Sequence, residues 1–361
     1  MISNLRDVLP PPIKYAVNRF VDAIITASGR IFSANRWLAN LYYFLLSRRF
    51  DREHLAVLKG RAAYYRALCE MGDTSPLLRR NVHRLEKGLI MQPRRNVFAE
   101  AFILETVHCY NCAKGRPTYS QDELRWATDV LDEYFSVVED TPPIRKARKE
   151  YSGEGAESKP RADIDPCTFK PYPLSACPET DVSFEQLATL FLRRRSVRWY
   201  KQEPVPPELI QQAINVAALA PSACNRQPYR FIVANDPSRA TEIAECAGGT
   251  TGFAHQIPVI IIVVGDLSAY PKERDRHLIY IDASLASMQL MLAAETLGLS
   301  TCPINWPDVD WSERRLQGIL DLPGYERVVM LISIGYGDLA SGIPYSQKKQ
   351  NELITQWCAE K

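Results

Sequence analysis

The sequence predicts an α/β or α+β domain that follows a mainly helical region, and three observations support this division. Apolar side chains recur at helical spacing within residues 1–150, and this pattern disappears across residues 151–182, which we interpret as a linker or wrapped arm. Within residues 183–361, helical patterns alternate with short runs of β-branched residues, which is typical of a mixed domain. Hydrophobic residues make up 46% of the chain and charged residues 24%, a balance that suits a globular protein.

The first 150 residues contain two clear helical patterns. Segments 52–72 and 120–140 both repeat apolar residues every three or four positions, with polar faces between them. Ser120 followed by Glu123 predicts a capping box that opens the second helix.

Segment 19–50 mixes aromatic and aliphatic residues with arginines, as a helix lying in a membrane interface does. A helix packed on the protein body or on a second subunit has the same pattern, and we favour that alternative. No apolar run reaches the roughly 20 residues of a membrane span, and no small-residue cleavage pattern follows the N-terminus. We therefore expect a cytoplasmic protein and leave peripheral membrane contact through residues 1–60 open.

Composition excludes several functions. A formal net charge of +2 argues against nucleic acid as a partner. Nine cysteines without framework spacing are typical of reduced thiols, and we interpret the lone pair Cys109 and Cys112 as helix-face thiols rather than metal ligands. The chain has no G-x-S-x-G, no P-loop and no histidine pair at metal spacing, so we predict no metal site and no acid, base or nucleophile triad.

The second half alternates elements of two kinds. Three segments read as helices, and the last of them is apolar on most sides and ends at Gly298: 184–200, 206–223 and 275–299. Three segments read as strands, and the second is a nearly continuous β-branched run expected to be covered on both faces: 229–236, 257–266 and 327–338.

Two stretches carry the polar chemistry of this domain. RRRSVRWY, residues 193–200, places four arginines at a helix end, where forked guanidinium groups suit a phosphate. A solvated basic helix end is the alternative. APSACNRQPYRFIV, residues 220–233, puts small and amide side chains between two apolar elements; they allow close approach of a flat ligand with donors and acceptors on its edge, although a polar turn is the simpler explanation.

These two stretches, together with three later ones, resemble the nitroreductase superfamily of FMN-dependent oxidoreductases. The order and spacing match over roughly residues 183–357, and the later motifs are DASLASMQLMLAAETLGLSTCPI at 282–304, ISIGYGD at 332–338 and IPYSQKKQ at 343–350. The resemblance implies an α+β, nitroreductase-like fold with a mostly antiparallel central sheet flanked by helices.

The resemblance also implies which residues hold FMN. In this family, the residues that hold the phosphate and the pyrimidine side of the ring match Arg194, Arg195, Ser196 and Arg198. Those that approach the flavin from the other subunit of a dimer match Pro221, Ser222, Ala223 and Asn225, with Gln227 close by. The backbone beside the reactive nitrogen matches Pro303, Ile304, Asn305 and Trp306, and a second phosphate-binding pair matches Lys348 and Lys349.

The implied function is a homodimeric FMN enzyme that takes hydride from NADH or NADPH and passes it to a small organic acceptor, such as a nitro compound or quinone, by a ping-pong mechanism. A guanidinium such as Arg198 beside the pyrimidine edge would stabilise the reduced flavin. Two alternatives stay open: a flavin-dependent oxidase or dehydrogenase of a specific metabolite, and a non-catalytic accessory protein held to a membrane or partner.

One basic stretch lies outside the resemblance, at residues 78–98. Arg80, Arg84 and Lys87 are spaced to share one helical face, with His83 beside them and Gly88 as the predicted helix stop. This face suits a pocket for a phosphorylated or carboxylated substrate, and a salt-bridged helix end is the alternative.

Overall fold

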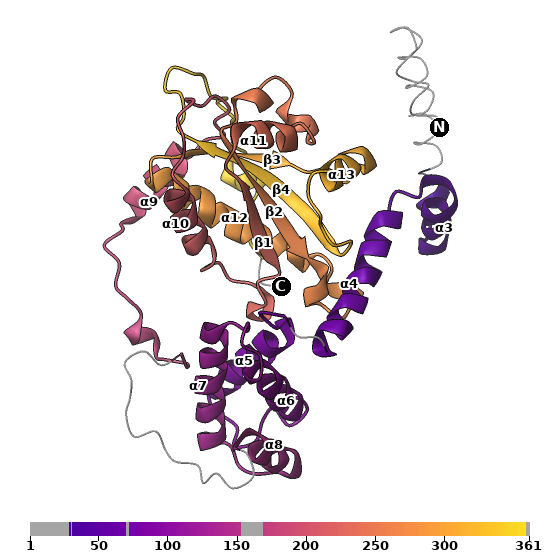
Figure 1. The fold of residues 1–361 in the computed structure, drawn as a ribbon, viewed down its shortest axis with the longest axis vertical. Helices are drawn as coiled ribbons and strands as arrows, with labels where there is room; N and C mark the ends of the chain where they lie inside the picture. The colour runs from indigo at the N-terminus through magenta and orange to yellow at the C-terminus, as the bar shows by residue number, and fades with distance from the viewer. Residues whose placement is uncertain (1–28, 30, 70–71, 153–168, 359–361) are drawn as a thin grey trace. The chain divides into compact units, whose positions relative to one another are not determined.

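A computed structural model describes residues 29, 31–69, 72–152 and 169–358, and the chain divides into two compact units, residues 1–55 and 56–361 (Figure 1). In the first unit, Asn35 caps α3 (Arg36–Leu41), which continues as a π-helix, η1 (Tyr42–Ser47). Segment 19–50 lies partly outside the described residues. Its described part is not one continuous helix, because residues 33–35 interrupt it before α3 and η1 ends at Arg48, whose φ is 54°.

The early helices are longer and pack together. α4 (Asp51–Cys69) spans the boundary between the units and confirms the first amphipathic pattern. α7 (Gln121–Val137) confirms the second, and it packs with α5 (Pro76–Leu89), α6 (Ile103–Lys114) and α8 (Pro142–Ser152). Their apolar faces share one buried core that includes Leu78, Val82, Leu85, Ile103, Leu131 and Ile144.

Two sequence predictions in this helical bundle were wrong in detail. α5 continues past Gly88 to Leu89, because the glycine accommodates a neighbour rather than ending the helix: a Cβ there would clash with the ring of Phe98. The capping box at Ser120 is half formed. The Ser120 hydroxyl accepts a hydrogen bond from the Glu123 backbone, but the Glu123 carboxylate does not return to Ser120, since other donors hold it.

The mixed domain begins after an exposed arm. Phe169 and Lys170 bond to acidic side chains of α7, and a short 3-10 turn, η2 (Leu174–Ala176), follows. The helices and strands of the domain then run in this order: α9 (Phe184–Arg193), α10 (Pro207–Ala217), β1 (Tyr229–Ala234), α11 (Pro237–Ala244), β2 (Val259–Asp266), α12 (Leu278–Thr296), β3 (Ser300–Asn305), α13 (Asp310–Gln317) and β4 (Glu326–Gly335). All predicted helices and strands of this half are present, and α11, β3 and α13 are additions.

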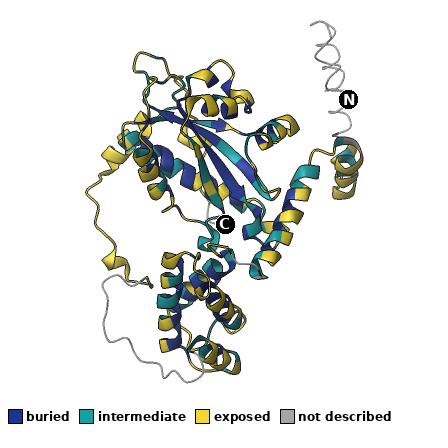
Figure 2. Ribbon diagram, viewed as in Figure 1, coloured by how far each residue is buried: buried dark blue, intermediate teal, exposed yellow. Residues whose placement is uncertain are grey.

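The four strands form one antiparallel sheet in the order β1-β2-β4-β3 (Figure 1). Successive side chains of β2 point to opposite faces, as strand geometry requires. Ile260, Ile262 and Val264 join the core on the α11 side, whereas Val259, Ile261 and Val263 join the core under α10 and α12. Figure 2 shows β2 buried along its length, so the prediction of a strand covered on both faces is confirmed.

α12 is the central helix of the domain. It contacts all four strands and ends where Gly298 adopts a left-handed φ of 78°, as predicted. Among the described residues, one helix, covering 273–296, is long and apolar enough to cross a membrane by length and composition alone. Its contacts with the sheet account for this apolar character, because a helix in the core also needs apolar residues on most sides.

Candidate functional site

The basic cluster, residues 194–198, and the segment 303–306 lie side by side at the β3 edge of the sheet. The chain leaves α9 at Arg194 and forms a parallel bridge between Ser196 and Thr301, in which the Val197 amide donates to the Thr301 carbonyl at 3.1 Å. β3 pairs with β4 on its other side. Two stretches about 100 residues apart in sequence, 194–198 and 303–306, therefore meet at one edge.

The arginines of this edge have no acidic partner among the residues that the structure describes. Arg194, Arg195 and Arg198 are half-buried, and none forms an ion pair with a carboxylate there. Arg193, by contrast, points away to Glu295 at 2.9 Å. The Nη1 atom of Arg194 is buried and has no hydrogen-bond acceptor.

This arrangement fits a bound phosphate. A buried N–H group without an acceptor costs about 1–3 kcal/mol, more when the group is charged, and three neighbouring guanidinium groups repel one another. A phosphate would supply both the acceptor and the missing negative charge. The residues present are therefore of the kind that would hold the phosphate of FMN.

Arg195 connects this edge to the C-terminal segment. Its Nη2 atom donates to the carbonyl of Tyr345 at 2.6 Å and also to the carbonyl of Pro344. Lys348 and Lys349 follow in the same segment and are exposed. Arg195 therefore tethers the segment that carries the predicted lysine pair.

In the 303–306 segment, the side chains of Ile304 and Trp306 are buried and that of Asn305 is exposed. Ile304 is buried in the core, and the Trp306 indole donates to Glu313 at 2.9 Å. Pro303 is tolerated because β3 is an edge strand. Burial raises the pKa of the neighbouring Cys302 thiol, while the charge of Arg198 and a hydrogen bond with Ser196 act in the opposite direction.

The loop that joins α10 to β1 is tightly folded around a 3-10 turn, η3 (Ala223–Asn225). Cys224, Asn225 and Gln227 all have positive φ values between 47° and 53°, which side-chain-bearing residues rarely adopt. The Ser222 hydroxyl accepts a hydrogen bond from the backbone amide of Gln227 at 3.1 Å. The backbone amide of Ala223 donates to the buried carboxylate of Asp282 at 3.0 Å. The Ser222 hydroxyl and the Ala223 backbone amide therefore both help to hold this loop.

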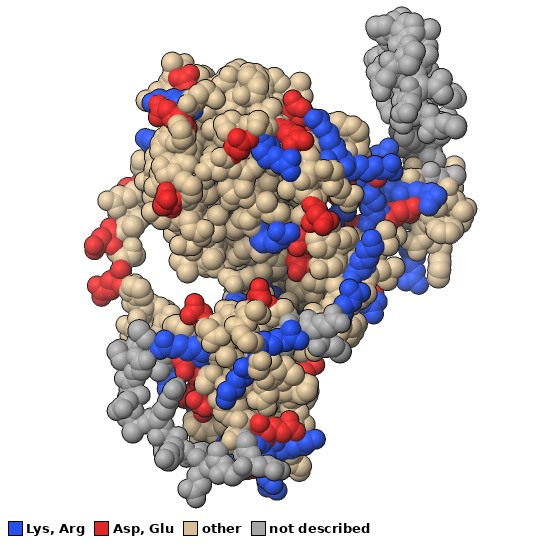
Figure 3. Space-filling model, in the orientation of Figure 1, with Lys and Arg blue, Asp and Glu red and all other residues tan. Residues whose placement is uncertain are grey.

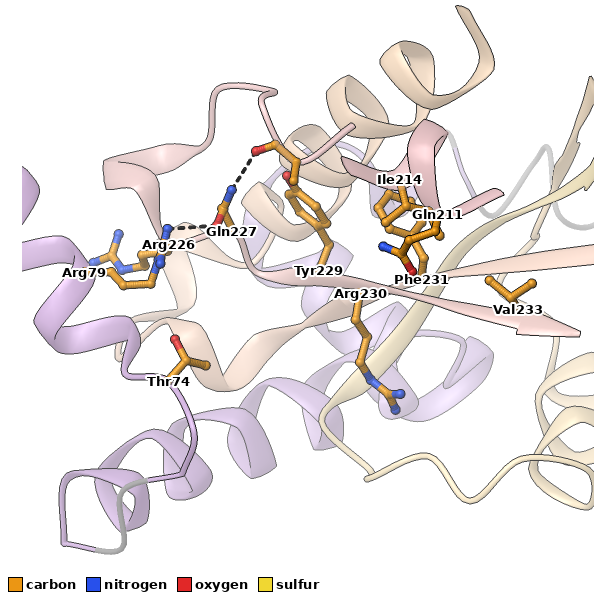
Figure 4. Close-up of a pocket in the computed structure, with 11 residues that line it drawn as sticks. Thr74, Arg79, Gln211, Ile214, Arg226, Gln227, Tyr229, Arg230, Phe231 and Val233 are labelled. Carbon is orange, nitrogen blue, oxygen red and sulfur yellow. Dashed lines mark hydrogen bonds between the residues drawn. The ribbon is translucent and has the colours of Figure 1, made fainter. Parts of the chain in front are cut away.

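Arg79, which sequence reasoning did not select, holds this loop from α5 (Figure 4). Its guanidinium donates to the Asn225 carbonyl and to the Gln227 side-chain oxygen, each at 2.8 Å. The Gln227 amide nitrogen donates to the Ala218 carbonyl at 2.8 Å, so both ends of this side chain are bonded within the chain. Beside them lies a groove of about 440 Å³ whose lining includes Arg226, Tyr229, Arg230 and Phe231.

The two predicted groups of cofactor residues do not meet within one chain. The loop 221–227 leads into β1, and the cluster 194–198 is bridged to β3. β1 and β3 are the two outer strands of the sheet.

The structure gives the predicted substrate residues of α5 different partners. Arg80 donates to Glu105 at 3.1 Å, and His83 lies 3.3 Å from Glu86. The Arg84 guanidinium stacks 3.7 Å above the ring of Phe102, and its pKa is lowered by burial and by the charges of Arg80 and Arg226. Lys87 is exposed.

Cys109 and Cys112 both lie on α6, as predicted, but only Cys109 is buried. Burial raises the pKa of the Cys109 thiol to about 11. Within the described ranges, no three His, Cys, Asp or Glu side chains gather in a way that could hold a metal ion.

Comparison with known proteins assigns the class of the chain first. A profile described as the nitroreductase family matches residues 192–251 and 240–336. A protein of Archaeoglobus fulgidus, provisionally named an NADH dehydrogenase/NAD(P)H nitroreductase, is 31% identical over 160 residues, which cover 42% of this chain and 86% of that protein.

Two further relatives extend the comparison. Human iodotyrosine deiodinase 1 is 24% identical over 272 residues, covering 67% of this chain and 88% of that protein. The solved structure of an FMN-dependent nitroreductase from Clostridium difficile is 25% identical, with a TM-score of 0.41, and covers 47% of this chain and 98% of that one.

The chain belongs to the nitroreductase family. The predicted α+β fold, with its antiparallel sheet between helices, is confirmed. Members of this family are flavin-dependent oxidoreductases, so the coarse reaction class applies to this chain.

Proposed function

We propose that the protein is a homodimeric FMN-dependent oxidoreductase that transfers electrons from NADH or NADPH to a small organic acceptor. The observation that carries this proposal is the set of half-buried arginines at the β3 edge, which lack carboxylate partners among the described residues. Arg194 and Ser196 would bind the FMN phosphate, and Arg198 would lie at the pyrimidine side of the ring. Lys348 and Lys349 would reach the phosphate on the segment that Arg195 tethers.

Bound FMN supplies a carrier that accepts hydride from the nicotinamide and then reduces the acceptor. The chain orients this group. The edge backbone from Pro303 to Trp306 would lie along the ring, and the positive charge of Arg198 would favour the reduced, anionic form. The sequence predicts no acid, base or nucleophile triad, which agrees with a reaction whose chemistry the flavin would supply.

The dimer is supported by two features. The loop 221–227 and the basic cluster lie at opposite sheet edges, so two copies are needed to bring such groups together. α9 is amphipathic yet buries none of its residues, with Phe184 79% and Leu192 78% exposed. Figure 3 shows few charged side chains over α9 and α10, as expected for a surface that a second copy covers.

The acceptor is best matched by an anionic aromatic compound. Arg84 stacks on Phe102 without a carboxylate partner in the described part of the chain, and α5 contacts the 223–225 turn. Arg84 would bind a carboxylate or phosphate on the acceptor, whereas Arg80 pairs with Glu105, His83 bonds to Glu86 and Lys87 is solvent-exposed.

The absorption spectrum of the purified protein tests the proposal. With FMN bound, we expect flavin peaks between about 350 and 550 nm that bleach when NADH or NADPH is added without air. Flavin peaks that persist with both nicotinamides, together with fast reoxidation after chemical reduction, would favour an oxidase. A protein that binds no added FMN would contradict the proposal.

A second candidate is reductive dehalogenation of an aromatic substrate, because deiodinase relatives align over 67% of this chain and thus beyond the family profile. In this reaction two electrons and a proton replace carbon-bound iodine by hydrogen and release iodide. Chemically reduced protein mixed with 3-iodotyrosine would release one iodide per flavin oxidised. No iodide release, beside normal reduction of a nitroaromatic compound, would exclude this candidate.

A further inference from the structure

A buried carboxylate lies where the N-terminal ends of α5 and α7 meet. The Glu123 side chain is 2% exposed and accepts hydrogen bonds from the Thr74 hydroxyl at 2.5 Å, the Ser75 amide at 3.1 Å and the Tyr119 hydroxyl. Arg79 Nη1 is its fourth donor, at 3.0 Å. A buried carboxylate with this many donors is held in one place, because losing any donor leaves a lone pair without compensation.

Arg79 links the fixed Glu123 carboxylate to the 222–227 loop. The same guanidinium that binds Glu123 donates from Nε to the Asn225 carbonyl and from Nη2 to the Gln227 side chain. Figure 4 shows the bond to Gln227. The side chain is only 16% exposed and lies 5.5 Å from the ring centre of Trp126. Because the donors of a guanidinium form a rigid planar fork, fixing one side of it fixes the other.

The loop needs such a brace. Backbone positions with positive φ in residues other than glycine cost conformational free energy and persist only when surrounding contacts hold them. Cys224, Asn225 and Gln227 are three such positions within four residues. Arg79 contacts the last two of them, and Gln227 is bonded from its other side by the Ala218 carbonyl.

We propose that Arg79 is a positioning residue that transmits the rigid geometry of the helical bundle to the Ser222–Gln227 loop and thereby holds that loop ready for the flavin. The part of this inference that concerns the flavin rests on the proposed function. The contacts by which Arg79 holds the loop do not depend on it. They give the helical bundle a role in the flavin site that the family resemblance does not cover.

The first test needs no cofactor. Hydrogen exchange of the loop amides is measured in the wild-type protein and in Arg79→Met, with Arg148→Met as the matched control. Arg148 also forks between two backbone carbonyls and a carboxylate of the helical bundle, but it has no contact with the loop. We expect exchange in residues 222–227 to quicken about tenfold or more in Arg79→Met alone. Equal protection in both variants would overturn the proposal.

The second test measures flavin binding. Titration with FMN should give a dissociation constant about tenfold weaker for Arg79→Met than for wild type or Arg148→Met, with a changed visible spectrum. Arg79→Lys keeps the charge near Glu123 but loses the fork, so we expect an intermediate value. If Arg79→Met does not fold, Gln227→Leu carries both tests, because it leaves the Glu123 contacts intact.

The two possible failures give different results. Wild-type protein that binds no FMN would contradict the proposed function and leave the exchange result standing. Wild-type and Arg79→Met proteins with equal affinities and spectra would overturn the positioning role of Arg79 while keeping the flavin assignment.

Discussion

The two edges of the sheet carry guanidinium groups in opposite electrostatic circumstances. At the β1 edge, Arg79 is paired with Glu123, and Arg230 forms two bonds with Glu326. At the β3 edge, Arg194, Arg195 and Arg198 have no carboxylate partner within the described residues. Both edges are rich in arginine, so residue type alone does not separate them. The presence of a carboxylate partner separates them. A guanidinium paired with a carboxylate (compensated) stabilises the fold, and one without such a partner (uncompensated) fits an anionic ligand.

The largest expected effect is on stability, at the compensated edge. Glu123→Gln turns an acceptor of four hydrogen bonds into a neutral amide whose NH₂ faces donors. We expect the free energy of unfolding to fall by about 3 kcal/mol or more, as for other broken buried pairs. Urea denaturation measures this loss. Glu133→Gln is the control, because its contact with Lys170 is at the surface and worth about 1 kcal/mol at most. Equal losses in the two variants would remove the basis of the comparison.

The next effect is on FMN binding, at the uncompensated edge. Arg194→Met removes a half-buried donor without breaking an ion pair, so we expect unchanged or higher stability together with FMN affinity about 30- to 100-fold weaker. Fluorescence titration with FMN measures the affinity. Arg193→Met, which loses only the contact with Glu295, should bind FMN as wild type does. A large loss of stability in Arg194→Met would show that this arginine is structural after all.

A smaller effect is expected on the acceptor. Arg84→Met should raise the KM for 4-nitrobenzoate about tenfold, because one charged hydrogen bond to the carboxylate is lost. Steady-state rates with 4-nitrobenzoate and with uncharged nitrobenzene give the ratio of the two kcat/KM values. Arg94→Met, a substitution of an exposed arginine outside this cluster, is the control. If Arg84→Met left the preference for 4-nitrobenzoate over nitrobenzene unchanged, Arg84 would belong with the arginines that stabilise the fold.

The smallest effect is a difference in pH dependence between two aspartates. Burial raises the pKa of Asp282, beside the β1 loop, so the folded state holds this proton more tightly than the unfolded state. Wild type should therefore lose stability relative to Asp282→Asn as pH rises from about 4, the ordinary aspartate value, through the raised pKa.

Asp338 provides the opposite sign. Bonds from Ser341 and the Ala340 amide lower its pKa, so wild type should lose stability relative to Asp338→Asn as pH falls below about 4. Thermal unfolding of each pair across pH 3–7 measures both slopes. Slopes of the same sign would show that burial does not distinguish these two positions.

Much of the fold could be predicted because its signals are local. The β-branched run of β2 and the apolar faces of α12 are visible in short windows of sequence. β3 was missed as a strand because it is short and contains Pro303, so its pattern is weak. α13 carries few apolar residues, since only one side of it is covered.

The candidate site was predicted unevenly for a related reason. The arginine cluster stands out in one eight-residue stretch, whereas Arg79 meets Asn225 and Gln227 across about 146 positions. The Ser120 and Glu123 pattern was a true signal of a helix start. It did not indicate that Tyr119, Thr74 and Ser75 would donate hydrogen bonds to the Glu123 carboxylate in place of Ser120, because those contacts depend on tertiary structure.

The position of the two groups at opposite edges of the sheet has a consequence for genetics. If each flavin site takes its basic cluster from one copy and its 221–227 loop from the other, a substitution at one edge of a chain damages only one of the two sites to which that chain contributes. A chain defective at the β3 edge and a chain defective at the β1 edge would each be inactive alone. Expressed together, they would form mixed dimers in which one of the two sites is intact. Two alleles that damage different edges would therefore complement each other, and two that damage the same edge would not.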